Sequence, residues 1–362
     1  MLTSKEPKRS NRSTGKLNSK NIAPIIEMLD SSSTLFKYEL TLSKDDRELK
    51  FSVVQMMTII FFIEIKKLTF YEFRELTDGR GGQMILKNLG MPKGPDGRYI
   101  RPSDGWISDF RNHRYIFFRK DLDDEIRRMI LKEKNGSDMI FTIDSTPLEA
   151  SRYSAWADFN PHYRIKMAKA HIIMVDGIPF MSTFTNGNVN DNPVFQNLLE
   201  SMQDYNVHGA QFYADGGYDS HDSYANTFRL TGTVLNGNAG SNGRYHDNAT
   251  FKNLKRHYNK HHNDFGFRPS GAVTAEFMIN YLKSCGDDIG GWFLRNLDIM
   301  RGDRLHKEAA LKRHICETVH HSMKRWVDLT VRGLHKKYAE RRTSLRLTVC
   351  TLLSMMFVPY SG

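Results

Sequence analysis

The spacing of hydrophobic residues along the chain changes at about residue 138. Before this point, apolar residues recur at helical spacing, and the densest run, FSVVQMMTIIFFIEIKKL at 51–68, predicts a buried helix. After this point, short runs rich in β-branched and aromatic residues alternate with amphipathic stretches. Alternating strands and helices are typical of an α/β domain. We therefore expect a mainly helical N-terminal region followed by an α/β domain.

Short apolar runs in the second half predict the strands of one sheet. Two of them, DMIFTID at 138–144 and AQFYAD at 210–215, finish on an aspartate, and GTVLN follows at 232–236. The segment 171–185 predicts two more strands around a central Asp-Gly turn, because Asp-Gly between apolar runs is a strong hairpin signal.

Two amphipathic helices are predicted between these strands. The first, DNPVFQNLLESMQDY at 191–205, has Asp191 or Asn192 as its expected N-cap and Pro193 in its first turn. The second covers about 219–229. The order strand, hairpin, helix, strand, helix, strand predicts a mixed five-stranded sheet flanked by helices.

Composition and periodicity together predict a division into four consecutive segments. The first twenty residues are polar and basic, and much of the region after 236 is rich in Gly, Asn and Asp, which favours loops. The segments are a flexible basic arm (1–21), a helical region (22–135), the α/β domain (136–346) with a loop-rich insertion at about 237–300, and a C-terminal apolar segment (347–362).

The chain is basic, with 52 Lys and Arg residues against 41 Asp and Glu residues and a formal net charge of +11. This balance favours a polyanionic partner, nucleic acid before an anionic membrane. A helix starting at Ser103 or Asp104 would carry Arg111 and Arg114, and a basic aromatic helix after a turn is compatible with a helix-turn-helix DNA reader. The alternative is a packing helix with a solvated basic face.

No secretory signal or membrane span is visible in the sequence. The first twenty residues are polar, and the two most apolar runs, 51–63 and 347–358, are shorter than the ~20 residues that a spanning helix needs. Three widely spaced cysteines, never in a CxxC pair, argue against a disulfide framework or a zinc site. We expect a cytoplasmic protein.

Two aspartates, Asp144 and Asp215, each follow a β-rich run and precede small residues. In an open α/β sheet, ligands gather at strand ends. If the two strands are neighbours, the carboxylates come within reach of one metal site, and oxygen ligands suit Mg²⁺. The alternative is that each aspartate forms a turn or caps a helix.

The stretch ALKRHICETVHHSMKR at 310–325 holds one acid, Glu317, among seven Lys, Arg and His residues. On a helical wheel, a polar stripe faces away from an apolar stripe formed by Ile315, Val319, Met323 and Trp326. The members of the polar stripe are Arg313, Glu317, His320 and Lys324. The alternative interpretation of Glu317 is a surface ion pair with Arg313, one helical turn earlier.

These acids and their surroundings resemble the DDE transposases of bacterial and archaeal insertion sequences, over about 138–346. That family carries a Tyr-x2-Arg-x3-Glu-x6-Lys signature, and this chain has Arg313, Glu317 and Lys324 at matching spacing, with Ala310 in place of the Tyr. The family's Tyr is associated with handling the cleaved element end. Further matching pieces are TIDST around Asp144, TNGNVNDN at 185–192 and YADGGYDS around Asp215.

The resemblance implies a ribonuclease H-like catalytic domain in which Asp144, Asp215 and Glu317 hold Mg²⁺, with Mn²⁺ as a substitute. It implies an endonuclease and strand transferase without a nucleotide cofactor. Water would free a 3′-hydroxyl at the element end, and this hydroxyl would attack target DNA.

The resemblance also implies double-stranded DNA as partner, at terminal inverted repeats and at the target, with a homodimer or larger assembly forming on DNA in a prokaryotic cytoplasm. Two alternatives stay open from the residues alone: a metal-dependent DNA nuclease, and a transposase-derived DNA-binding protein that has lost catalysis. The basic residues expected to contact DNA are Arg313, Lys324, His320, Arg325, Arg111 and Arg114.

Overall fold

The computed structural model describes residues 22–45, 50–132, 134, 138–218, 220–233, 235–237, 259, 304–332 and 335–357. The chain divides into two compact units, Met1–Ser108 and Asp109–Gly362. The predicted basic arm and nearly all of the predicted insertion lie outside the described residues.

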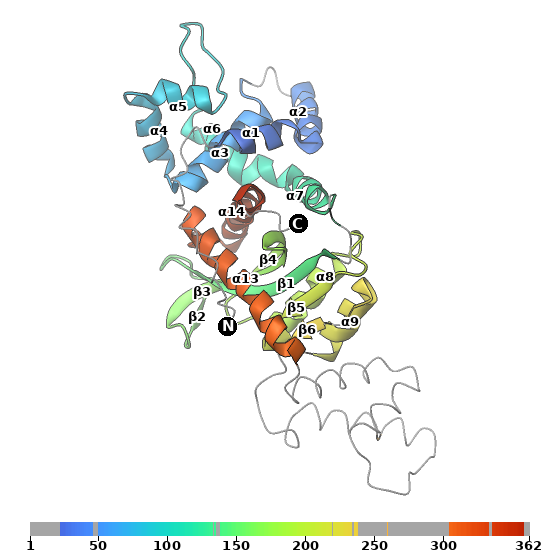
Figure 1. Cartoon of the computed structure of the whole chain (residues 1–362). Coiled ribbons are helices and arrows are strands. Elements are labelled where there is room, and N and C mark those ends of the chain that lie inside the picture. The colour runs from blue at the N-terminus through green and yellow to red at the C-terminus, as the bar shows by residue number, and fades with distance from the viewer. Residues whose placement is uncertain are drawn as a thin grey trace, which may run out of the picture. The chain divides into compact units, whose positions relative to one another are not determined.

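The first unit is helical, as its hydrophobic spacing predicts (Figure 1). Helix α3 forms its core, because nearly every side chain along it is buried. The starts of α3 and α4 are fixed by capping boxes, in which Ser52 pairs with Gln55 and Thr69 pairs with Glu72. The helices are α1 (Ala23–Asp30), α2 (Ser33–Asp45), α3 (Val53–Lys66), α4 (Phe70–Asp78), α5 (Gly82–Asn88) and the start of α6 (Asp104–Asp109).

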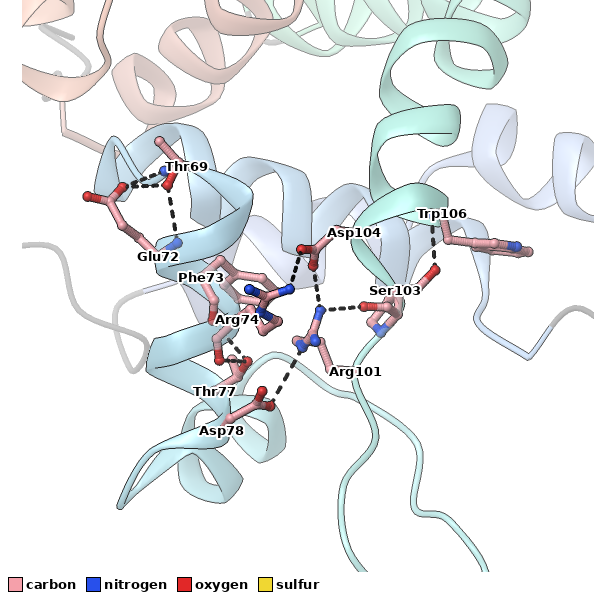
Figure 2. A network of polar contacts seen from close by, with 11 residues as sticks. Thr69, Glu72, Phe73, Arg74, Thr77, Asp78, Arg101, Ser103, Asp104 and Trp106 are labelled. Atoms are coloured by element: carbon pink, nitrogen blue, oxygen red, sulfur yellow. Dashed lines mark hydrogen bonds and ion pairs between the residues drawn. The ribbon is translucent and has the colours of Figure 1, made fainter.

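A polar network joins α4 to the beginning of α6 (Figure 2). Arg101 Nη1 donates to Asp104 Oδ1 at 2.8 Å, and Arg74 Nη1 lies 3.5 Å from Asp104 Oδ2. Arg101 Nε is also 3.9 Å from Asp78 Oδ1. Ser103 Oγ accepts the Trp106 N–H at 3.2 Å, so the predicted cap of this helix is confirmed at Ser103.

The second unit is built on one mixed sheet (Figure 1). Its order is β2-β3-β1-β5-β6, and β4 also pairs with β3. Strands β1, β5 and β6 are parallel, whereas β3 runs antiparallel to β1, β2 and β4. The strands are β1 (Ile140–Glu149), β2 (Asp158–Asn160), β3 (Ile165–Val175), β4 (Ile178–Asn186), β5 (Gln211–Ala214) and β6 (Leu235–Gly237).

The predicted mixed sheet is confirmed, and the short β2 adds a sixth strand to the five expected. The hairpin is confirmed as β3 and β4. Its turn residues Asp176 and Gly177 have φ of 48° and 81°, the left-handed pair that suits a tight hairpin. Helix α8 (Asp191–Glu200) corrects a prediction, because its cap is Asn190, whose side chain accepts the Asn192 N–H.

Helices cover the sheet of the second unit. Helix α13 contacts β1, β5 and β6, α14 contacts β4, and α8 contacts β3 and β4. Figure 1 shows α13 running across the strands. The helical elements are a π-helical turn (Phe110–Arg114), α7 (Tyr115–Leu131), α8, a 3₁₀ turn (Gly216–Tyr218), α9 (His221–Thr231), α13 (Arg304–Trp326) and α14 (Lys336–Phe357).

The two compact units divide after Ser108, whereas the sequence predicts a boundary near 135. Helix α7 belongs to the second unit because it packs on α14 and β4. The Tyr115 hydroxyl bonds the Thr348 hydroxyl at 3.2 Å, and Arg119 Nη1 donates to Ser344 Oγ at 2.9 Å. Helix α14 runs into the predicted C-terminal apolar segment and ends at Phe357.

Candidate active site

Asp144 and Asp215 lie level with each other on neighbouring parallel strands. The last pair between β1 and β5 is Ile143 with Ala214. Asp144 is the next residue of β1, and Asp215 directly follows the end of β5. Neighbouring strands are ~4.8 Å apart, and residues at the same level of parallel strands point to the same face. The predicted proximity of these two strands is confirmed.

The two carboxylates make the same local hydrogen bond. Asp144 Oδ1 accepts the Ser145 N–H at 2.8 Å, and Asp215 Oδ1 accepts the Gly216 N–H at 2.6 Å. One prediction needs correction: β1 does not end at Asp144 but continues to Glu149, because β3 keeps pairing with it. Asp144 therefore marks the end of the β1–β5 pairing, not the end of the strand.

Helix α13, which carries Glu317, contacts both β1 and β5. Glu317 and Lys324 are exposed, as the wheel predicts. The wheel is wrong about Ile315, which is 39% exposed. The buried face of α13 consists of Cys316, Val319, His320 and Met323.

His320 is only 7% exposed, and its Nδ1 lies 3.6 Å from Asp144 Oδ2. Burial lowers the pKa of His320 to about 4, with Lys324 acting in the same direction and Glu317 opposing. The imidazole is therefore neutral near pH 7. His320 thus lies on the buried side of α13 beside Asp144, and its contact with DNA stays a prediction.

The other predicted DNA contacts differ in their surroundings. Lys324 and Arg325 are exposed on α13, and partial burial lowers the pKa of Lys324. Arg114 Nε pairs with Asp109 Oδ2 at 3.1 Å, on the π-helical turn of the second unit. Arg111 is half-buried on the same turn. Arg313 lies on α13, and its side chain is outside the described residues.

Sequence reasoning missed a polar cluster beside Asp144. Asp191 Oδ1 lies 2.9 Å from Lys169 Nζ, and Asp191 Oδ2 accepts the Ser145 hydroxyl at 3.2 Å. Burial raises the pKa of Tyr218, and the charges of Asp191 and Asp144 raise it further. Alternation along β3, which puts Lys169 and His171 on one face, is the sequence signal that predicts part of this cluster.

The donor chemistry of the acids suits a hard divalent cation, since all three offer carboxylate oxygens. Within the described part of the chain, no three His, Cys, Asp or Glu side chains are arranged so that they could hold a metal ion. One oxygen of each aspartate is turned onto the following backbone N–H. A site with three carboxylate ligands would also need Glu317, which is exposed on α13.

Comparison with known protein families assigns most of the second unit to one family. Residues 135–353 match the family described as "Transposase DDE domain", a span that contains all three acids. No curated protein matches the chain.

One solved structure, the cryo-EM structure of the piggyBac transposase synaptic complex with hairpin DNA, matches at 12% identity and a TM-score of 0.33. The match covers 93% of this chain and 82% of that one. A TM-score of 0.33 is too low to assign a fold or a function. The family assignment therefore rests on the match over residues 135–353. No described helix is long and apolar enough to cross a membrane.

Proposed function

Because the chain belongs to the transposase DDE domain family, we propose that it is a DNA transposase of an insertion sequence. In this proposal it binds the ends of its element, cleaves DNA there and joins the freed end to target DNA. The observation that carries the proposal is the level placement of Asp144 and Asp215 on adjacent parallel strands, under the helix that bears Glu317.

Asp144, Asp215 and Glu317 would hold Mg²⁺, or Mn²⁺ as a substitute. Two such ions, when bound, activate the attacking oxygen and stabilise the leaving oxygen of a displacement at phosphorus. The protein's own contribution is to fix two of the carboxylates on a rigid sheet. His320, neutral and buried against Asp144, would exclude water from one side of that carboxylate.

Lys324 and Arg325 follow Glu317 on α13 and are exposed. On the proposed function they contact the phosphates of the DNA that enters the site, together with Arg313 of the same helix. Arg suits this role because its guanidinium can bind a phosphate bidentately. Assembly as a dimer or larger complex on DNA, in a prokaryotic cytoplasm, is part of the same proposal.

A strand-transfer assay tests the proposal, with purified protein, Mg²⁺ and DNA that carries the terminal repeats flanking the coding sequence. We expect cleavage and joining by the wild type. Asp215→Asn and Glu317→Gln should abolish both reactions and leave DNA binding intact. Asp222→Asn, at an exposed acid of α9, is the matched control and should retain activity.

Three results would contradict the proposal in different ways. Cleavage without joining would identify a metal-dependent nuclease on the same scaffold. Wild-type activity in either substituted protein would remove that acid from the site, and an inactive wild type that still binds DNA would identify a protein that has lost catalysis.

A further inference from the structure

We propose that Asp191, held by Lys169, is a positioning residue that fixes Asp144 from the opposite face of the sheet. The inference rests on the proposed function, since it concerns the orientation of a carboxylate assigned to the active site. It gives a role to an aspartate that starts a helix without capping it.

The two faces of β1 follow from its alternation. Phe141 packs with Phe212, which also meets Phe195 of α8, so odd-numbered residues of this part of β1 face α8. Asp144 is even-numbered and faces His320 of α13. Ser145 is the next residue and therefore points to the α8 side.

On that side, Ser145 is the direct cross-strand partner of His171, and Lys169 lies two residues earlier on the same face of β3. Asp191 of α8 reaches both strands. Its Oδ1 lies 2.9 Å from Lys169 Nζ and 3.7 Å from His171 Nδ1, and its Oδ2 accepts the Ser145 hydroxyl at 3.2 Å. Lys169 Nζ also donates to the Val189 carbonyl at 3.2 Å. This bond attaches the segment that precedes α8 to strand β3.

Ser145 carries this restraint to the other face. Its side chain is held by Asp191, and its backbone N–H donates to Asp144 Oδ1 at 2.8 Å. Fixing the Ser145 peptide fixes the direction of that N–H, and with it the rotamer of Asp144. The second oxygen of Asp144 then faces α13, where His320 lies 3.6 Å away. Partners that orient a ligand from behind commonly change metal affinity or activity by about 10–100-fold when removed.

The test uses Ser145→Ala in the full chain, because this change removes the hydroxyl and keeps the backbone N–H. Binding of Mn²⁺ alone is measured from the EPR signal of the free ion, and DNA cleavage is measured in parallel. We expect Ser145→Ala to weaken Mn²⁺ binding and to slow cleavage, each by about ten-fold. Ser145→Thr keeps the hydroxyl and should restore both to within about two-fold.

A matched control separates positioning from general stability. Lys134 pairs with Asp176 at the start of β1, and the side chains of this pair are 15% and 17% exposed, against 19% and 23% for Lys169 and Asp191. Lys134→Met should therefore destabilise the sheet about as much as Lys169→Met. Only Lys169→Met should weaken Mn²⁺ binding.

A double-mutant cycle gives a second readout. Asp191→Ala and Ser145→Ala remove the two ends of one hydrogen bond, so their effects on Mn²⁺ affinity should not add. The double variant should bind Mn²⁺ about as tightly as the single variant with the lower affinity. Additive effects, or wild-type Mn²⁺ affinity in Ser145→Ala, would overturn the inference and leave the proposed function intact. A wild type that binds no Mn²⁺ would instead contradict the metal assignment on which both depend.

Discussion

His171 predicts a measurable loss of stability in acid. Its side chain is fully buried on β3, and Nε2 lies 2.9 Å from the Thr185 hydroxyl. Burial lowers the pKa of His171 to about 4 from 6.5; Asp191 opposes this shift and Lys169 adds to it. The folded protein therefore holds the ring neutral at a pH where the unfolded chain would protonate it.

The sign and size follow from linkage. Between pH 6.5 and pH 4 only the unfolded chain binds a proton at this imidazole, so the stability of the folded state falls as pH falls. Above pH 6.5 the ring is neutral in both states, and it no longer makes the stability depend on pH. One pKa unit corresponds to about 1.4 kcal/mol, so between pH 7 and pH 4.5 the wild type should lose roughly 2–3 kcal/mol of stability that a variant without this imidazole does not lose.

The variant is His171→Gln, which keeps a polar side chain for Thr185 and does not titrate. Unfolding in urea is followed at four pH values by hydrogen exchange of β3 and β4 peptides, since these report on the sheet and not on the whole chain. His162→Gln, at an exposed position after β2, is the control and should keep the wild-type pH dependence. An identical pH dependence in wild type and His171→Gln would refute the reasoning.

Three further predictions concern other parts of the chain. Lys324→Ala should weaken DNA binding and reduce the slope of log affinity against log salt by about one, as measured by titration at several salt concentrations; an unchanged slope would exclude a phosphate contact. Phe141→Ala should lower the free energy of unfolding by about 3–5 kcal/mol, because the ring is fully buried and stacks on Phe212 at 4.9 Å; urea unfolding measures this. Ser52→Ala should cost about 1 kcal/mol and should speed hydrogen exchange in the first turn of α3, since it breaks the capping box with Gln55.

Features with a local cause were predictable from the sequence. The hairpin follows from two adjacent residues that accept left-handed backbone, and the strand before Asp215 follows from a short β-rich run. The level placement of Asp144 and Asp215 needed one more assumption, that their strands are neighbours, and the pairing of β1 with β5 meets it.

Features with a distant cause were not predictable. A helical wheel gives the angles between residues of 310–325 but not which side of the helix meets the sheet. It therefore groups His320 with the exposed basic residues, whereas the structure buries this side chain beside Asp144. The amphipathic pattern of α7 likewise does not state which core it joins. The partners of Asp191 lie 22 and 46 residues away on β3 and β1, so its neighbourhood in sequence shows only a helix start.

The register of β1 connects these observations. Side chains alternate between the two faces of the sheet, so a shift of the β1 register by one residue would turn Asp144 to the opposite face. The face that packs against α13 would then lack this carboxylate. Two lysine–aspartate pairs hold β1 on either side of Asp144: Asp176, paired with Lys134, accepts the Ile140 N–H at 3.2 Å, and Asp191 accepts the Ser145 hydroxyl. The first restrains the backbone where the strand begins, and the second restrains the residue next to the carboxylate. Only the second pair can set the rotamer of Asp144. Lys134→Met and Lys169→Met should therefore lower the stability by similar amounts, but only Lys169→Met should lower the Mn²⁺ affinity.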